Sequence, residues 1–314
     1  MRRPGLHTAL SVIALCCTLG LAGEPRLPAR PPVLRLAFLG DVMLGRGVAQ
    51  AHAGGDWASA LAYLAPELQQ ADFSLANLES PLTRRPLVRP AYDLRGPSGA
   101  AFALSAAGLR AVGLANNHSL DCGPGGVEDT RQALATAGVR AIGPTLQAES
   151  FDLSGYRLAV IALDDVSAPV DPSAAGAAVR QAAMQADLVI VLAHWGMEYQ
   201  AGPTPAQQAL AKALASAGAG VIIGAHPHVL QPLAWLPRPG RADRALVAYS
   251  LGNALFDQPA PPDAALGAML RVDWSSSGIR AVQVAPFHVN ALAGQVEAPS
   301  PEEAQTIQQR LMIK

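Results

Sequence analysis

The sequence contains a series of short apolar runs that each end directly at a polar residue, and this feature restricts the fold more than any other. The runs lie at about residues 33–39, 73–78, 111–115, 188–193 and 221–224. Runs of this length in which apolar residues predominate, without regular polar alternation, are typical of strands that are buried on both faces of a sheet. Since segments with helical spacing separate most of these runs, the pattern predicts a layered α/β domain.

The remaining predicted elements complete this layered fold. Helices are expected at about residues 58–70, 97–108, 126–137 and 204–217, and a further strand at 157–163. Three late strands follow without helices between them, at about 245–250, 268–272 and 280–289. Their order predicts that one end of the sheet is antiparallel. Ser300 to Glu303 combine an N-cap serine, a proline and two acidic residues, which predicts a short C-terminal helix.

Composition excludes two classes of protein. Half of the 314 residues are hydrophobic and 15% are charged, so the chain has enough apolar mass for a packed core and is not expected to be disordered. The formal net charge is −1 and no basic run is present. A protein that binds nucleic acid by neutralising many phosphates is therefore not expected.

The first 22 residues have the features of a secretory signal peptide. Arg2 and Arg3 precede an uncharged, mostly apolar stretch at 8–22, which ends in Gly20-Leu21-Ala22 with small residues at the −3 and −1 positions of a cleavage site. The apolar stretch is shorter than the roughly 20 residues of a membrane-spanning helix. We therefore predict export to the periplasm or cell envelope, with cleavage of residues 1–22.

Two alternatives to cleavage remain open at this stage, a retained N-terminal anchor and lipid modification of Cys16 or Cys17. The proline-rich residues 23–32 are predicted to form a leader. The main domain is predicted at 33–290, followed by a C-terminal tail with a short helix at 291–314.

Polar side chains with metal-binding chemistry gather at the ends of the predicted strands. Carboxyl ends of neighbouring parallel strands meet at one edge of a sheet, where ligands bind. Carboxylate, amide and imidazole ligands together suit a divalent ion such as Mn, Fe or Zn. The sequence thus predicts a centre with one or two divalent metal ions built from Asp41, Glu79, Asn117, His118, His194, His226 and His228.

Each of these residues also has a structural interpretation when taken alone. Gly40-Asp41 is typical of a turn, and Asn117 of a loop with left-handed backbone. Two imidazoles flanking Pro227 are rarely needed for packing alone, and the recurrence of such residues at five successive strand ends favours a site. His52 and His288 do not follow strand-like runs, and we predict that both are structural.

Six ordered strings resemble bacterial capsule-synthesis proteins of the CapA, poly-γ-glutamate type. Their order and spacing are similar over about residues 33–290. The strings are Gly40-Asp41-Val42-Met43-Leu44-Gly45-Arg46, Ala76-Asn77-Leu78-Glu79, Ala115-Asn116-Asn117-His118-Ser119-Leu120-Asp121-Cys122-Gly123, His194-Trp195-Gly196-Met197-Glu198-Tyr199, Gly224-Ala225-His226-Pro227-His228-Val229-Leu230-Gln231 and Tyr249-Ser250-Leu251-Gly252-Asn253. The resemblance implies a calcineurin-like metallophosphatase fold, in which a β-sandwich of mixed sheets is flanked by helices.

The resemblance also implies roles for single residues. Asp41 and His228 would bind a first metal ion, and Glu79 would take the place of the bridging carboxylate. A second ion would be held by Asn117, His194 and His226. His118 matches the histidine that protonates a leaving group.

One departure from the metallophosphatase pattern affects the expected chemistry. Met43 stands where a histidine usually follows the first aspartate by two residues, so the first ion would lack a nitrogen ligand. Turnover is therefore less firmly implied than metal binding.

The leading hypothesis is an exported protein of capsule or poly-γ-glutamate biosynthesis or processing with a metal-dependent, hydrolase-like site. Its partners would be an anionic polymer or a small anionic substrate, and the machinery of capsule synthesis and export. Arg46 lies near Asp41 in sequence and is predicted to bind a carboxylate or phosphate of the substrate, with a structural arginine as the alternative. Two rival hypotheses are a non-catalytic accessory protein of polymer synthesis or export, and a secreted metallophosphoesterase that acts on nucleotides or lipids.

Overall fold

The structure is a computed structural model that describes residues 1, 32–89 and 92–312. The predicted signal peptide after Met1, and the leader as far as residue 31, lie outside the described residues. The helices are α1 Arg46–Ala51, α2 Ala65–Leu68, α3 Ala101–Ala107, α4 Gly123–Thr136, α5 Pro172–Ala183, α6 Pro205–Ala217 and α7 Pro301–Arg310, with 3-10 turns η1 Ala58–Leu61, η2 Ser98–Ala100 and η3 Pro262–Ala265. The strands are β1 Leu34–Val42, β2 Phe73–Leu78, β3 Ala111–Gly113, β4 Arg140–Ile142, β5 Glu149–Leu153, β6 Tyr156–Asp164, β7 Leu188–His194, β8 Val221–Ala225, β9 Leu230–Pro237, β10 Arg244–Leu251, β11 Asn253–Leu255, β12 Leu266–Ser275, β13 Gly278–Asn290 and β14 Gln295–Glu297.

The strands form two mixed sheets. The first has the order β14-β13-β12-β1-β2-β3-β4, with β11 paired to β1, and the second has the order β5-β6-β7-β8-β10-β9. The pairs β1–β2, β2–β3, β6–β7 and β7–β8 are parallel, whereas β1–β12, β12–β13 and β9–β10 are antiparallel. The predicted antiparallel end is thus present, but the strands divide between two sheets.

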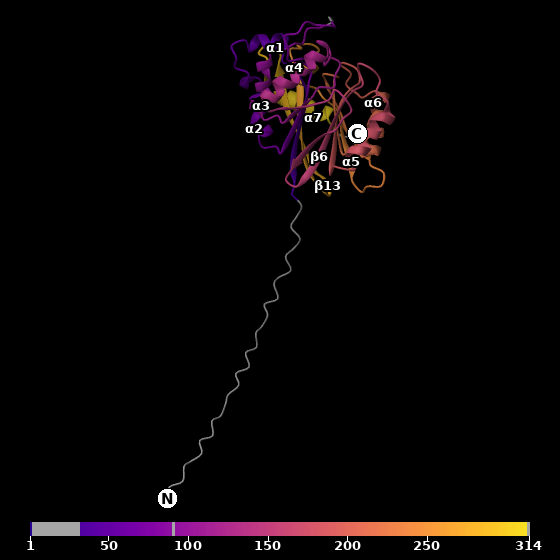
Figure 1. Ribbon diagram of the computed structural model, residues 1–314. Helices are drawn as coiled ribbons and strands as arrows, with labels where there is room; N and C mark the ends of the chain where they lie inside the picture. The colour runs from indigo at the N-terminus through magenta and orange to yellow at the C-terminus, as the bar shows by residue number, and fades with distance from the viewer. Residues whose placement is uncertain (2–31, 90–91, 313–314) are drawn as a thin grey trace. The chain divides into compact units, whose positions relative to one another are not determined.

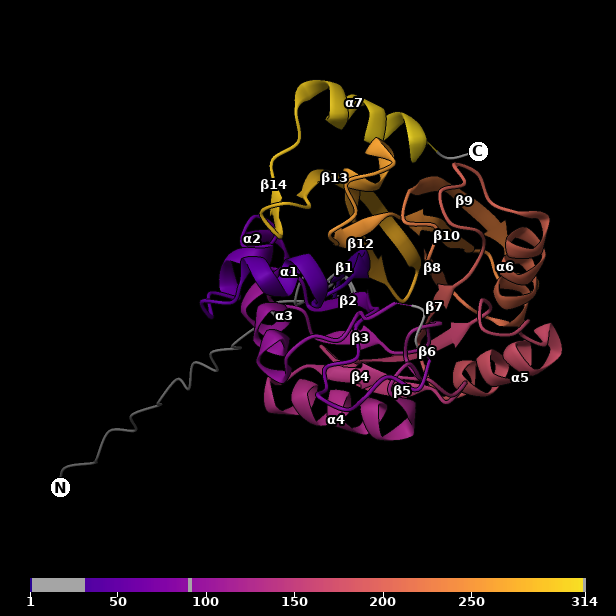
Figure 2. The same cartoon turned by 90° about the horizontal axis from the view of Figure 1, so that it is seen from above.

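Three apolar clusters bind these layers together. Strand side chains alternate between the two faces of a sheet. Phe38 of β1 therefore points into the cluster between the sheets, which also contains Ile190 of β7 and Ile223 of β8. Ala37 and Leu39 point to the opposite face, where they pack with the helices α1 to α4. The outer face of the second sheet packs on α5 and α6 in the same way. The result is a helix–sheet–sheet–helix arrangement (Figures 1 and 2), as the predicted β-sandwich flanked by helices requires.

The chain beyond Asn290 continues the same fold. β14 pairs antiparallel with β13, and Ile307 of α7 is buried in the cluster between the sheets. Ser300 caps α7 in a capping box with Glu303, as the sequence predicts. None of the helices among the described residues has the length and hydropathy needed to cross a bilayer.

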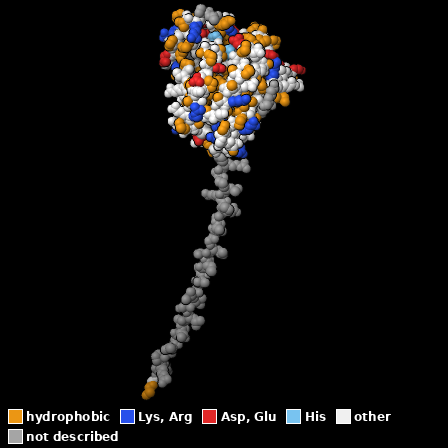
Figure 3. Space-filling view, turned by 90° about the vertical axis from the view of Figure 1, so that its right-hand side faces the viewer, with side chains coloured by type: hydrophobic (Ala, Val, Ile, Leu, Met, Phe, Trp, Pro, Cys, Tyr) orange, Lys and Arg blue, Asp and Glu red, His pale blue; other side chains and the backbone are white. Residues whose placement is uncertain are grey.

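The surface carries charge of both signs. Figure 3 shows one face of the molecule, on which basic and acidic side chains are interspersed among apolar and neutral atoms. This distribution agrees with the formal net charge of −1. A few histidine atoms are visible near the upper end of the same face.

Several elements differ from the sequence prediction. The expected helix at 58–70 is instead the 3-10 turn η1 followed by the single turn α2. Helix α5 has no counterpart in the prediction. Its buried face consists of Ala175, Gly176, Val179 and Ala182, so Val179 is the one large apolar residue on it, and Asp171 caps the helix by accepting a hydrogen bond from the backbone N–H of Ser173. The short strands β4, β11 and β14 are too brief to have a sequence pattern of their own.

Candidate metal centre

Strand ends from both sheets build the candidate metal centre. Asp41 lies at the end of β1, level with Asn77 of β2 and Asn253 of β11. Glu79 follows β2 directly, and His194 is the last residue of β7. The remaining predicted site residues lie in the loops that follow β3 and β8, and they are Asn117, His118, His226 and His228.

Glu79 lies in the middle of the histidines. Its Oε1 atom is 3.7 Å from Nε2 of His194, and 3.9 Å from Nε2 of both His118 and His228. Ligand atoms that share one ion at bond lengths of about 2.0–2.2 Å are themselves roughly 3–4 Å apart. The spacing around Glu79 is therefore that of a ligand set, although the roles of the single residues stay predictions.

Two buried atoms at this centre have no hydrogen-bond partner among the described residues. They are Oε2 of Glu79 and Nδ1 of His226. Ligand atoms of Glu79, His226 and His228 also lie within 4.8 Å of one another. Since buried polar atoms are rarely left unpaired, these atoms fit a cation as their missing partner.

Polar neighbours fix the orientation of the histidine rings. Nδ1 of His118 lies 2.7 Å from Oδ2 of Asp121, and Nδ1 of His228 lies 2.9 Å from Oδ1 of Asn253. In both residues Nε2 is therefore the nitrogen that faces Glu79. Histidines that bind metals are commonly oriented in this way by a carboxylate or amide oxygen on the other ring nitrogen.

His194 and Asn117 face each other at the edge of this group. Nε2 of His194 is 2.8 Å from Oδ1 of Asn117, while its Nδ1 is 3.3 Å from Nδ2 of Asn77. Two of the predicted ligands of the second ion are thus adjacent, and the atoms that would bind it point toward each other.

Asp41 is completely buried and both of its oxygens are engaged. Oδ1 accepts a hydrogen bond of 2.7 Å from Nδ2 of Asn77, and Oδ2 accepts one of 3.0 Å from the backbone N–H of His226. Oδ2 also lies 3.6 Å from Nδ1 of His228. The ligand role of Asp41 stays a prediction, and in this structure its carboxylate supports the histidine loop.

Burial sets the protonation states at the centre. Burial, followed by the nearby charges of Asp41 and Glu198, raises the pKa of Glu79 well above its ordinary value. Burial also raises the pKa of Asp41, although the charge of His228 opposes this shift.

The buried histidines shift in the opposite direction. Burial and the neighbouring histidines lower the pKa of His226 to about 3, and they lower the pKa of His194 well below its ordinary value. A neutral imidazole has the free lone pair that a metal ion requires. The histidines of the donor set therefore fit a divalent ion in both geometry and protonation.

Met43 and Arg46, which follow Asp41 in the string Gly40–Arg46, have other surroundings than Asp41. Met43 is fully buried in the core on the helix-covered face of the first sheet, and its sulfur accepts a hydrogen bond from the backbone N–H of Gly45. Arg46 forms an ion pair with Asp257 through Nε and Nη2, and its guanidinium lies 5.6 Å from the ring centre of Phe256. Asp257 thus holds the predicted substrate-binding arginine in place, and its binding role stays a prediction.

The structure also adds polar residues that sequence reasoning did not assign. Asn116 donates hydrogen bonds to Oδ1 of Asn77 and to the carbonyl oxygen of Leu78, and thereby ties the loop after β3 to the end of β2. Their position in the sequence could have pointed to them, because all of them lie within the six strings that resemble the capsule-synthesis proteins. They are Asn77, Asn116, Asp121, Tyr199 and Asn253.

His52 and His288 lie apart from the centre. The ring nitrogens of His52 contact the carbonyl oxygens of Asp56 and Gly294, and Nδ1 of His288 contacts Glu303. These contacts join segments of the fold, as expected for structural histidines.

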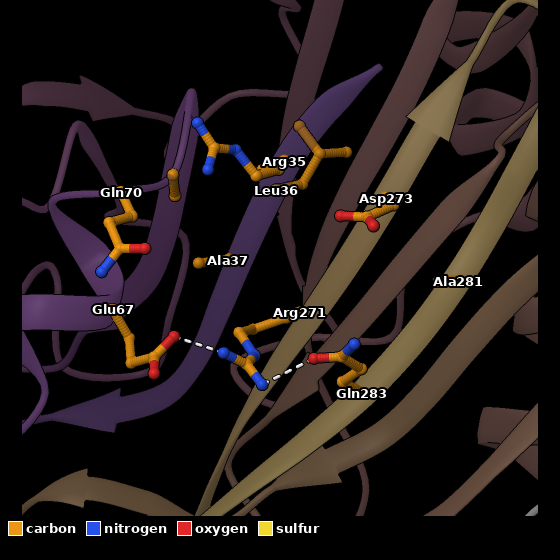
Figure 4. A pocket seen from close by; sticks show the side chains of 10 residues that line it. Arg35, Leu36, Ala37, Glu67, Gln70, Arg271, Asp273, Ala281 and Gln283 are labelled. Carbon is orange, nitrogen blue, oxygen red and sulfur yellow. Dashed lines mark hydrogen bonds and ion pairs between the residues drawn. The ribbon is translucent and has the colours of Figure 1, made fainter.

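A separate hollow lies near the start of β1 rather than at its end. It has a volume of about 220 Å³ and is lined by residues that include Arg35, Glu67, Arg271 and Gln283. Figure 4 shows Arg271 between Glu67 and Gln283, with which it forms an ion pair and a hydrogen bond. Since Arg271 is paired with Glu67 and Arg35 with Asp72, we assign no chemistry to the hollow.

Comparison with known proteins identifies relatives of the whole fold. The chain is 27% identical over 307 residues to the PGA biosynthesis protein CapA of Bacillus subtilis, and the match covers 90% of this chain and 77% of that protein. It is 31% identical over 258 residues to the capsule biosynthesis protein CapA of Bacillus anthracis, where the match covers 72% of this chain but only 60% of that protein.

The fold itself is similar to that of a phosphatase from Mycoplasma pneumoniae. The TM-score is 0.55 at 13% sequence identity, and the similarity covers 88% of this chain and 98% of the other. The predicted calcineurin-like metallophosphatase fold is thereby confirmed. Residues 35–258 match the family described as bacterial capsule synthesis protein PGA_cap, and because this match covers more than half of the chain, the protein belongs to that family.

Proposed function

We propose that this protein is exported and acts in capsule or poly-γ-glutamate biosynthesis through a metal-dependent, hydrolase-like site that takes an anionic polymer or a small anionic substrate. The observation that carries the proposal is the position of Glu79, whose Oε1 atom is within 3.9 Å of Nε2 of His118, His194 and His228. Membership of the capsule synthesis family supports the biological process.

The residues that would hold the metal come from both sheets. Asp41, Glu79 and Asn117 would supply oxygen atoms, and His194, His226 and His228 would supply nitrogen atoms. When bound, a divalent ion at this position supplies Lewis-acid polarisation of a substrate oxygen and activation of water. Burial of Glu79 and His194, both 1% exposed in their side chains, keeps bulk solvent away from the ligand atoms.

His118 has the geometry of a proton donor. Asp121 holds its Nδ1, and Nε2 faces the centre. Its side chain is 15% exposed, compared with 1% for His194 and 3% for His228. A ring that is oriented by a carboxylate and is partly exposed suits transfer of a proton to a leaving group.

Metal analysis tests the proposal directly. We expect protein purified without chelator to contain about one or two divalent ions per chain. The double variant His226→Ala/His228→Ala should lose them, and His288→Ala serves as a matched control because its contact with Glu303 lies apart from the centre. Absence of metal from the wild-type protein, or equal metal content in the double variant, would contradict the proposal.

Met43 favours a second candidate function, a non-catalytic accessory role. Its side chain is buried in the core instead of providing a nitrogen ligand, so the centre could bind polymer without turning it over. A panel of γ-glutamyl peptides and phosphoesters assayed with metal-loaded protein separates the two functions. Hydrolysis that is lost with the metal supports the enzyme, whereas metal-dependent binding without hydrolysis supports the accessory protein.

Export is tested separately. Expressed with its own N-terminus in a Gram-negative host, the chain should reach the periplasm or envelope, shortened by roughly 20–25 residues. Full-length protein in the cytoplasm would contradict this, and fatty-acid labelling of the shortened chain would favour lipidation.

A further inference from the structure

A chain of hydrogen bonds runs from the buried His228 at the centre to the exposed side chain of Tyr199. Nδ1 of His228 contacts Oδ1 of Asn253 at 2.9 Å, and Nδ2 of Asn253 donates to Oε1 of Gln258 at 3.1 Å. Nε2 of Gln258 then donates to the hydroxyl oxygen of Tyr199 at 2.9 Å. The three segments that contribute to this chain are far apart in the sequence.

The direction of every bond in this chain is fixed by one backbone carbonyl. Nδ2 of Asn253 also donates to the carbonyl oxygen of Ala264 at 3.0 Å, and a carbonyl oxygen can only accept. The amide oxygen of Asn253 must therefore face His228, which places a proton on Nδ1 of that ring and leaves Nε2 free toward Glu79. The oxygen of Gln258 must likewise face Asn253, so its amide nitrogen faces Tyr199.

This polarity leaves the Tyr199 hydroxyl as a donor. A phenol has one proton, and its oxygen accepts the hydrogen bond from Gln258. Within the part of the chain that the structure describes, no hydrogen bond gives this proton an acceptor. The side chain is partly open to solvent, since Tyr199 is 40% exposed. The hydroxyl is therefore free to donate to a bound molecule.

The backbone also holds Tyr199 close to the metal centre. Its N–H donates to the carbonyl oxygen of Pro227 at 2.8 Å, and Pro227 lies between His226 and His228. The ring centres of Tyr199 and His228 are 6.1 Å apart. Tyr199 has a φ angle of +61°, a backbone conformation that is unfavourable for a residue with a side chain and is common at functional sites.

We infer that Tyr199 is a substrate-contacting residue whose hydroxyl donates a hydrogen bond to an oxyanion at the centre, and that Gln258 and Asn253 are the positioning residues that direct it. The ligand chemistry is a carboxylate or phosphate oxygen. This inference rests on the proposed function for the presence of the metal, but the hydrogen-bond chain exists within the protein itself.

The test uses metal-loaded full-length protein and two probes, inorganic phosphate and tri-γ-glutamate. A hydrogen bond to a charged group changes affinity by about tenfold or more. Tyr199→Phe should therefore weaken binding of a probe about tenfold while metal content stays unchanged. Tyr63→Phe is the matched control, because Tyr63 is 45% exposed and lies between η1 and α2. The probe that shows the larger effect identifies the source of the oxyanion.

The positioning role of Gln258 requires a double variant. Gln258→Met should weaken probe binding in the wild-type background but have no effect in the Tyr199→Phe background, because the hydroxyl that it directs is then absent. A merely structural role would reduce binding in both backgrounds. Equal affinity of Tyr199→Phe and wild type for both probes would overturn the inference.

The experiment also distinguishes failure of this inference from failure of the proposed metal centre. A wild-type protein that keeps its metal but binds neither probe overturns the inference and leaves the metal centre intact. A wild-type protein without metal contradicts the proposed function, and the inference is then decided on metal-free protein by nitrogen-15 NMR of the histidine rings. A proton on Nδ1 of His228 supports the inferred chain, and a proton on Nε2 would overturn it.

Discussion

Oδ2 of Asp41 accepts a hydrogen bond of 3.0 Å from the backbone N–H of His226, and this bond joins the two sheets at the edge where the candidate ligands lie. Asp41 belongs to β1 of the first sheet, and His226 follows β8 of the second. The same carboxylate accepts a hydrogen bond from Asn77. His226 has a φ angle of +95°, so this contact holds a strained backbone conformation in place.

Two substitutions of Asp41 should distinguish the contribution of its hydrogen bonds from the contribution of its charge. Asp41→Ala leaves buried donors of His226 and Asn77 unpaired, and each unpaired donor costs about 1–3 kcal/mol of unfolding free energy. Asp41→Asn keeps an acceptor and should cost less. Both variants should lower metal affinity, by about 10–100-fold if Asp41 orients the histidines. Urea unfolding and metal titration measure the two effects, and full metal affinity in Asp41→Asn would contradict a role in the centre.

The histidine pKa values predict how stability of the metal-free protein depends on pH. The pKa of His226 is about 3 in the folded protein, compared with about 6.5 in the unfolded chain. Between these values the unfolded state binds the extra proton, so stability is fully present above about pH 6.5 and falls as the pH drops toward 3. The slope is about 1.4 kcal/mol per pH unit for each such proton. The pKa of His194 is shifted in the same direction.

The carboxylates act in the opposite direction. The pKa values of Asp41 and Glu79 are raised by burial, so their contribution to stability is present at low pH and is lost as the pH rises through the folded values. Urea unfolding of chelator-treated protein at about pH 7, 6 and 5 should show the histidine effect, and His226→Gln should reduce the slope. A slope that is the same in both proteins would show that His226 is not the group responsible.

Arg46 and Asp257 should affect substrate binding more than metal binding. Asp257 engages Nε and Nη2 of Arg46, and a lysine cannot reproduce this two-pronged contact. Arg46→Lys is therefore expected to raise KM for an anionic substrate several-fold and to leave metal content unchanged. Asp257→Asn should act in the same direction, because it loosens the guanidinium. Unchanged KM in both variants would favour a structural role for this ion pair.

The sequence predicts the fold and the gathering of the site residues because both depend on local pattern. Buried strands such as β7 and β8 have continuous apolar sequences, and the next polar residue of each, His194 or His226, lies at the sheet edge. The division into two sheets does not follow from local pattern, because Asp41 and His226 meet only through the packing of β1 against the second sheet.

The hydrogen-bond partners at the site could not be predicted for the same reason. Asp257 reaches Arg46 across 211 positions of the sequence, and Asn253 reaches His228 across 25. No spacing rule connects such residues. Asp121 is the exception, since it lies three positions after His118, and a local search for a carboxylate partner of this histidine would have found it.

The last prediction distinguishes proton transfer from metal binding at the two histidines that face Glu79 from different sheets. His118 is oriented by Asp121 and is the more exposed of the two, whereas His194 is buried and contacts Asn117. His118→Ala should keep the fold and most of the metal but lose about 10²–10⁴-fold of the activity, as expected for loss of a general acid. His194→Ala should lose metal as well as activity.

Circular dichroism, metal content and turnover need to be measured on wild type and both variants. Equal loss of metal in both variants would make His118 a ligand, which its 3.9 Å distance from Glu79 also permits, and full function of both in polymer production would favour the accessory role.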